Sequence, residues 1–185
     1  MSSNQASVNT IGLKALQAQT LLARALSSRQ FSDVEPAVAA WHHLASITDS
    51  TYPYREAILS TFAVALLLRW ETYHDLSDLD LAIQQADRAL RMCHTGPNRD
   101  RYQNLANLGG AYFDRARSAN EGPERAMQDA KWAYSYLEKA YYIYVRRGKE
   151  LNLVSRHSGS VQSNQMILTE QFSEMGDHGL TRARP

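Results

Sequence analysis

Apolar residues recur along this chain at intervals of three and four, and polar segments interrupt the pattern at regular distances. Such spacing places apolar side chains on one face of an α-helix, whereas a strand needs apolar and polar residues to alternate. Alternating runs of Val, Ile and Thr are absent from the sequence. The chain is therefore predicted to be all-α, with about seven helices. We expect them over residues 9–28, 32–47, 55–73, 79–93, 99–118, 124–147 and 150–175.

Helix-breaking segments divide the chain into hairpins. Residues 48–53, 95–98 and 120–123 are rich in turn-forming residues, and each segment contains a proline. The polar residues 1–8 and 176–185 are predicted to be flexible arms, so one helical repeat domain is expected over residues 9–175. Its parts are three hairpins, over about residues 9–48, 55–93 and 99–147, and a closing helix over 150–175.

The third predicted helix is repeated in the fifth at a constant offset of 46 residues. The shared pattern begins with a basic residue, continues with apolar positions four, seven and eleven residues later, and ends with an arginine. Its members are Arg55, Leu59, Phe62, Ala63, Leu66 and Arg69 in one helix, and Arg101, Leu105, Leu108, Gly109, Tyr112 and Arg115 in the other. These positions share one helix face. The small residue, Ala63 or Gly109, is where a neighbouring helix could approach closely.

The helices that follow these two are also related. The fourth and sixth predicted helices match at an offset of 51, through Ala82, Ile83, Ala86, Ala89 and Leu90 against Ala133, Tyr134, Leu137, Ala140 and Tyr141. The second helix matches the fourth at an offset of 45, through Ala37, Val38, Trp41, Leu44 and Ala45. The chain is therefore interpreted as three hairpins, each with a first (A) helix and a second (B) helix, of which the first A helix matches least well.

Two segments of the third hairpin resemble the tetratricopeptide repeat. Leu105-Ala-Asn-Leu108-Gly109-Gly-Ala-Tyr112 is similar to its first helix, and Tyr136-Leu137-Glu-Lys-Ala140-Tyr-Tyr-Ile-Tyr144 to its second. The closest resemblance is to long-period repeats of fungal proteins, and it rests on Pro97-Asn-Arg99, Arg101, Asn107-Leu108-Gly109 and Asp80-Leu-Ala82-Ile83. The period here is about 45 residues, which departs from the usual 34. The resemblance covers residues 33–147. It implies a tetratricopeptide-like stack of antiparallel helical hairpins, forming a short right-handed solenoid that acts as a protein–protein interaction scaffold.

The resemblance also implies where a partner would bind, because A helices line the groove of such stacks. Carried over by register, the groove positions are Ser60, Val64, Leu67, Leu68, Gln103, Ala106, Gly110, Phe113 and Asp114. The Lys and Asn residues with which some family members hold a C-terminal carboxylate are missing. An apolar groove that receives a peptide or helix is therefore expected. The alternative is that Leu67, Leu68 and Phe113 only pack against neighbouring helices.

Two further functions stay open. The helix over 124–147 carries five tyrosines and Trp132, which indicates burial on two sides or a surface for homo-oligomerisation. A small-molecule or enzyme pocket could instead form between the helix layers. Its lining would be aromatic, from Trp41, Trp70, Tyr112 and Tyr136.

Composition adds limits to the partners. Twenty basic against 19 acidic residues give a net charge of +1, which argues against nucleic acid as the main partner. No apolar run is long enough for a membrane span, and no cofactor is predicted. The single cysteine favours a reducing, cytoplasmic location, although residues 1–32 lack acidic residues as a mitochondrial transit peptide does. Catalytic and metal-binding motifs are not found. Asp75, Asp78 and Asp80 are interpreted as helix-cap and first-turn residues rather than an acidic metal site.

Overall fold

The computed structural model describes residues 3–93, 98–118 and 122–154, and side chains over 10–93, 101–118 and 122–146. Six helices and no strand occur in these described residues, which confirms the all-α class. The helices are α1 (Ser3–Ser28), α2 (Phe31–Ile47), α3 (Arg55–Tyr73), α4 (Leu76–Met92), α5 (Asn98–Arg117) and α6 (Pro123–Val154). No helix among the described residues is long and apolar enough to cross a membrane.

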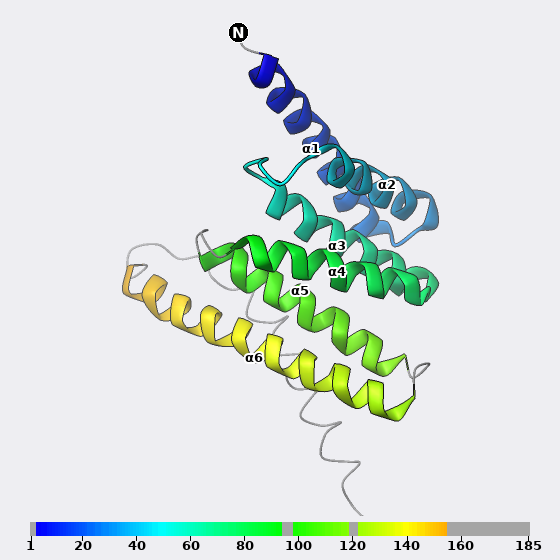
Figure 1. Ribbon diagram of the computed structural model, residues 1–185, viewed down its shortest axis with the longest axis vertical. Coiled ribbons are helices and arrows are strands. Elements are labelled where there is room, and N and C mark those ends of the chain that lie inside the picture. The colour runs from blue at the N-terminus through cyan, green and yellow to red at the C-terminus, as the bar shows by residue number, and fades with distance from the viewer. Residues whose placement is uncertain (1–2, 94–97, 119–121, 155–185) are drawn as a thin grey trace, which may run out of the picture. The chain divides into compact units, whose positions relative to one another are not determined.

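The helices pack in the order in which they follow one another. Residues Met1–Ala140 form one compact unit and Tyr141–Pro185 a second, so that α1 to α5 and most of α6 belong to the first unit. In that unit each helix from α1 to α4 contacts the next one, and α1 also contacts α3, as α3 contacts α5. Neighbouring helices run in opposite directions (Figure 1). The unit is therefore a tetratricopeptide-like stack of antiparallel helical hairpins, as predicted.

Three helix ends differ from the prediction by three residues or more, and one of them is the start of α4, which lies at Leu76 and not at residue 79. The first helix begins at Ser3, within the polar segment predicted as an arm over residues 1–8, because that segment holds no Pro or Gly to stop a helix. The sixth helix continues past Gly148 to Val154 instead of ending there. One glycine costs a helix only about 1 kcal/mol, and Lys149, Glu150 and Leu151 favour continuation. The remainder of the predicted closing helix and the arm over 176–185 lie outside the described residues.

The predicted apolar faces form the core. Leu59, Phe62, Ala63 and Leu66 of α3 are all 3% exposed or less, and so are Leu105 and Leu108 of α5. The B helices contribute small residues, because Ala82, Ala86 and Ala89 of α4 and Ala133 and Ala140 of α6 are fully buried. Small side chains on one helix allow the facing helix to approach closely.

At Gly109, α5 and α6 approach each other closely. A Cβ atom at this position would lie 2.7 Å from Cγ of Leu137 and 3.1 Å from its backbone nitrogen. The sequence predicted close approach at Gly109, and this distance confirms it. At Gly110, the next residue, a Cβ atom would meet nothing within 4 Å.

We expect the two neighbouring glycines to respond in opposite directions to alanine. Gly109→Ala should lower the free energy of unfolding by about 1–3 kcal/mol, since the α6 backbone must shift to admit the methyl group. Gly110→Ala should raise it by about 0.5–1 kcal/mol, because alanine favours helix and the site is open. Urea unfolding followed by circular dichroism measures both changes. Equal effects of the two substitutions would contradict the close approach.

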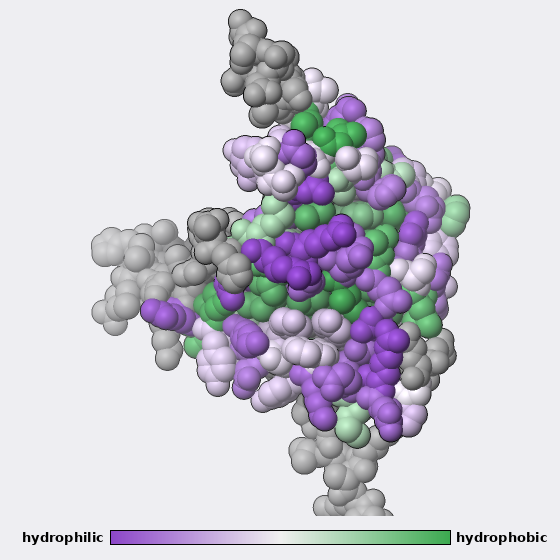
Figure 2. Space-filling model, in the orientation of Figure 1, coloured by the Kyte–Doolittle hydropathy of each residue, from purple (hydrophilic) through white to green (hydrophobic). Residues whose placement is uncertain are grey.

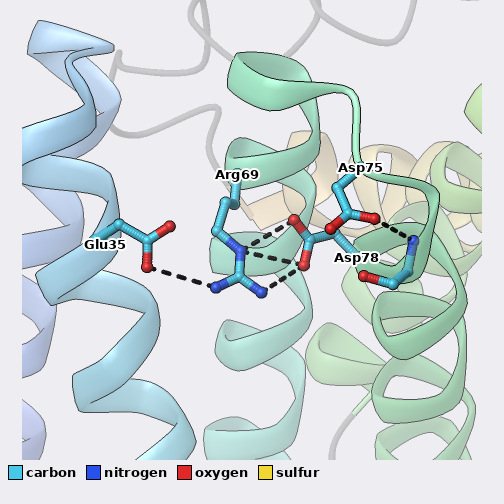
Figure 3. Close-up of polar contacts among 5 residues, drawn as sticks. Glu35, Arg69, Asp75 and Asp78 are labelled. Carbon is cyan, nitrogen blue, oxygen red and sulfur yellow. Dashed lines mark hydrogen bonds and ion pairs between the residues drawn. The ribbon is translucent and has the colours of Figure 1, made fainter.

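An arginine near the end of each A helix joins that helix to carboxylates. Arg69 of α3 donates from Nε to Oδ2 of Asp78 in α4, at 2.9 Å, and from Nη1 to Glu35 in α2, at 3.5 Å (Figure 3). Asp78 is 2% exposed. Hydrogen bonding to Asp78 raises the pKa of Arg69 above its ordinary value. One side chain thus connects the two helices of its own hairpin and the B helix of the preceding hairpin.

The same arrangement recurs at the repeat offsets. Arg115 of α5 donates from Nε and Nη2 to Asp129 in α6, at 2.8 Å each, and from Nη1 to Asp80 in α4, at 2.6 Å. In the first hairpin, Nε of Arg24 lies 2.8 Å from Oδ1 of Asp33. We call Arg24, Arg69 and Arg115 the junction arginines. Their spacings of 45 and 46 residues, and those of 45 and 51 between their Asp partners, match the offsets of the sequence repeat.

Removal of a junction arginine should strongly lower the free energy of unfolding only where the aspartate that it binds is buried. Arg69→Ala and Arg115→Ala each leave a carboxylate that is 2–5% exposed without its cation, and should lower the free energy of unfolding by about 3–5 kcal/mol. Arg24→Ala removes a pair in which the arginine is 60% exposed, and should cost about 1 kcal/mol or less. Urea unfolding at pH 7 tests this order. A similar cost for all three variants would contradict it.

Candidate functional site

A pocket of about 750 Å³ lies between the first two A helices. One wall comes from α1, the other from α3, and α2 and the α2–α3 loop supply aromatic side chains. The lining residues are Gly12, Leu13, Ala15, Gln19, Trp41, Tyr52, Tyr54, Ala57, Ile58 and Thr61. None of them carries a charge, and the polar groups among them are an amide, a threonine hydroxyl, two phenols and an indole. The pocket therefore favours an uncharged, largely apolar ligand.

Hydrogen bonds hold the α2–α3 loop that brings Tyr52 and Tyr54 to this pocket. Nη1 of Arg55 donates to the carbonyl of Ala45 at 2.9 Å and also to the carbonyl of Thr48. Asp49 accepts from both the backbone N–H and the hydroxyl of Thr51, and the hydroxyl bond holds the pKa of this carboxyl below its usual value. The loop is thus fixed at its start and at its end, so the tyrosines are placed by the backbone.

The aromatic side chains of the pocket range from buried to exposed. Trp41 is 5% exposed, and its indole Nε1 has no hydrogen-bond partner in the part of the chain described here. Tyr52 is half-buried and packs edge-on against Tyr54, which is 65% exposed. Leu13 and Leu16 of α1 are each 66% exposed. Hydrophobic side chains gather on α1 immediately after the grey N-terminal residues (Figure 2). Apolar surface therefore continues from the pocket onto the outside of α1.

At the corresponding position between α3 and α5, polar side chains form hydrogen bonds across the two helices. Nδ2 of Asn104 donates to Glu56 at 2.6 Å, and Nδ2 of Asn107 donates to Ser60 at 3.4 Å. The offset that relates Arg24 to Arg69 places Ala15 where α3 has Ser60. Ile58 and Thr61 stand where α5 has Asn104 and Asn107. Less polar side chains thus border the pocket at the first junction of A helices, whereas amides form hydrogen bonds across the second one.

Residues at the same repeat positions as the predicted groove line this pocket, but they belong to α1, the A helix of the preceding hairpin. Ser60 and Val64 were predicted to line the groove on α3, and Gln103, Ala106 and Gly110 on α5. The α1 residues at the same positions of the repeat are Gly12, Ala15 and Gln19, which do line the pocket. These residues were not predicted, because the first A helix lacks the apolar pattern of the other two. Arg24 and Asp33, spaced like Arg69 and Asp78, were the available signal.

The predicted groove residues are not among those that line the pocket between α1 and α3. Ser60, Val64, Leu67, Ala106, Gly110 and Phe113 are half-buried, Gln103 is exposed, and Leu68 is buried in the core at 2% exposure. Leu68 therefore cannot meet a partner without a change of structure. The guanidinium of Arg117 lies 5.5 Å from the ring centre of Phe113.

Asp114, the last of the predicted groove residues, lines a smaller pocket at the ends of α3 and α5. This pocket has a volume of about 310 Å³, and its lining is Trp70, Glu71, His74, Asp114, Arg117 and Ser118. Burial, with a contribution from the nearby charge of Glu71, raises the pKa of Asp114 to about 6. Glu71 itself is paired with Arg29, which lies between α1 and α2. The carboxyl of Asp114 therefore takes up a proton at mildly acidic pH.

This raised pKa predicts a pH-dependent effect of Asp114→Asn. The folded chain binds the proton more tightly than the unfolded chain, so the ionised carboxyl destabilises the fold as the pH rises from about 4 through 6. Asp114→Asn should raise the free energy of unfolding by about 1–3 kcal/mol at pH 7 and by much less at pH 4. Urea unfolding at both pH values measures this difference. An equal effect at both would show that Asp114 titrates normally.

The four aromatic residues considered for a single pocket are distributed over three places. Trp41 lines the first pocket and Trp70 the second. Tyr112 and Tyr136 stack at 5.8 Å between α5 and α6, and Trp132 stacks on Tyr136 at 5.9 Å. Burial raises the pKa of both tyrosines. Among the described residues, these four side chains therefore do not line one common pocket.

The acidic residues between α3 and α4 have structural partners. Asp75 caps α4 by accepting from the backbone N–H of Ser77 at 3.0 Å, and the pKa of Asp75 is lowered by this bond (Figure 3). Asp78 and Asp80 bind junction arginines. The cap and first-turn interpretation is thus confirmed for Asp75 and Asp78. Among the described residues no group of three His, Cys, Asp or Glu side chains could hold a metal ion.

Comparison of this chain with known protein families, curated proteins and solved structures found no match.

Proposed function

We propose that this protein is a non-catalytic scaffold that binds an apolar segment of a partner protein in the pocket between α1 and α3. The observation that carries the proposal is the uncharged pocket of about 750 Å³ formed by two A helices. The resemblance of the third hairpin to tetratricopeptide repeats supports a binding role, because the A helices of such stacks line the binding surface. The lining includes no Asp, Glu, His, Lys, Arg or Cys side chain that could transfer a proton or act as a strong nucleophile.

The chemistry of the partner follows from the shape and lining of the pocket. Two parallel walls of helix and an apolar floor suit the anchor residues of a peptide or of an amphipathic helix. Leu13 and Tyr54, both about two-thirds exposed, would cover the flanks of such a segment. A carboxylate or phosphate would find no cation in this pocket, so the anchors should be uncharged.

A second candidate function is binding of a small hydrophobic molecule. The pocket volume falls in the range of about 300–1,000 Å³ that small-molecule sites have. Tyrosine hydroxyls and the unpartnered Nε1 of Trp41 could orient such a molecule. The two candidates differ in the ligand that the same pocket selects.

Selection from a random 12-residue peptide library on the immobilised full chain tests the first candidate. We expect enriched peptides with large apolar residues at helical spacing. Their affinity should fall at least tenfold for Ala57→Trp, which places a ring in the pocket at an exposed position. Ala130→Trp, the same change at an exposed position of α6, is the matched control and should bind as the unchanged chain does.

Two other outcomes would redirect the proposal. Loss of binding in Leu67→Asp with Phe113→Asp, but not in Ala57→Trp, would place the site on the groove predicted from the repeat register. No peptide enrichment, together with binding of a neutral fluorophore such as Nile red that Ala57→Trp abolishes, would favour the small-molecule function. Circular dichroism checks that each variant remains helical.

A further inference from the structure

Three residues on the side of α6 that faces away from α5 form what we call the outer stripe: Lys131, Tyr134 and Glu138. Their spacing of three and four residues places them on one face of the helix. Ala133, Leu137 and Ala140, which are buried, lie on the opposite side. Tyr134 is 55% exposed, and its hydroxyl lies 3.4 Å from Oε1 of Glu138.

The corresponding stripes of α2 and α4 are covered by the next A helix. In α2, Glu35 binds Arg69 of α3 and the ring of His42 lies 5.6 Å from that of Phe62. Val38, which lies between them, is 5% exposed. In α4, the stripe of Asp80, Ile83 and Asp87 begins with the bond from Asp80 to Arg115, and Ile83 is 8% exposed. The central residue is thus buried in both earlier hairpins and exposed in α6.

The charge at the first position of the stripe differs in α6. Glu35 and Asp80 hold this position in α2 and α4 and bind a junction arginine, but α6 has Lys131. A second copy that continued the stack with its own α1 would bring Arg24 to this place, because Arg24 has the register of Arg69 and Arg115. Two cations would then meet at a contact that elsewhere joins opposite charges. Head-to-tail stacking of copies is therefore disfavoured.

The outer stripe is instead complementary to itself in an antiparallel arrangement. When two copies of α6 lie side by side about a two-fold axis next to Tyr134, Lys131 and Glu138 lie at nearly equal distances on either side of that axis. Each lysine then faces the glutamate of the second copy, and the two Tyr134 rings meet at the centre. The stripe of α4, with Asp80 and Asp87 at these positions, would bring acid against acid.

We propose that the outer stripe of α6 joins two copies of this chain in a symmetric, antiparallel dimer. Such an interface is isologous, so each Lys131–Glu138 contact occurs twice. The contact involves one helix from each copy and lies at the small end of stable interfaces, so the dimer should form at micromolar concentration or above. The stripe lies outside the pocket between α1 and α3, and the two proposals can therefore fail separately.

Charge reversal on the full-length chain tests the dimer by sedimentation equilibrium from 1 µM to 1 mM. We expect the unchanged chain to dimerise across this range. Lys131→Glu and Glu138→Lys should each weaken the dimer at least tenfold, because like charges then face one another twice. The double variant, Lys131→Glu with Glu138→Lys, should restore dimerisation, since the opposite charges face one another again in exchanged positions.

Arg88→Glu is the matched control, because Arg88 is exposed on α4 and the change alters the net charge as Lys131→Glu does. It should leave the dimer unchanged. The unchanged chain remaining a monomer at 1 mM would overturn the proposal. Failure of the double variant to recover would also overturn it, since the contact would then not be the reciprocal one.

Discussion

Arg69 lies between two carboxylates that belong to different hairpins, and the stack depends on this kind of contact. The guanidinium group binds a buried aspartate of its own hairpin and a glutamate of the preceding one. Because a guanidinium is planar and donates in fixed directions, the two acids set the orientation of three helices at once. Arg115 repeats the contact one hairpin later. Apolar packing alone would allow helices to slide by a turn, whereas a buried ion pair broken by such a slip would leave a charge without a partner.

The first junction of A helices forms a pocket, whereas hydrogen bonds cross the second one. The side chains at equivalent repeat positions differ between the two junctions. Glu56, Ser60, Asn104 and Asn107 connect α3 to α5 by hydrogen bonds. Between α1 and α3 the equivalent positions hold Ile11, Ala15, Ile58 and Thr61, which cannot form such a network. The same stack of helices thus has a hydrogen-bonded contact between α3 and α5 and an apolar pocket between α1 and α3.

The sequence predicted the arrangement of the helices better than the position of the candidate site. Helix periodicity and the repeat offsets led to the all-α class, the hairpin stack and the close approach at Gly109, because these depend on patterns that recur. The length of α6 was mispredicted because Gly148 is a weak helix breaker when helix-forming residues follow it. The pocket between α1 and α3 was not predicted, because its walls depend on which small residues face each other across these two helices. Which residues face each other across two helices is determined by packing and not by the local sequence pattern.

The buried arginine–aspartate pairs also show how much the segments between A and B helices can differ in length. Asp78 lies nine positions after Arg69, and Asp129 lies 14 positions after Arg115, although both pairs have the same geometry. The difference of five residues is an insertion that the third hairpin has accommodated without loss of the contact. Extra loop length adds little entropic cost when the ends of the loop are held in place. The segment after each A helix is thus a natural position for grafting a tag, a reporter or a second binding sequence into this protein.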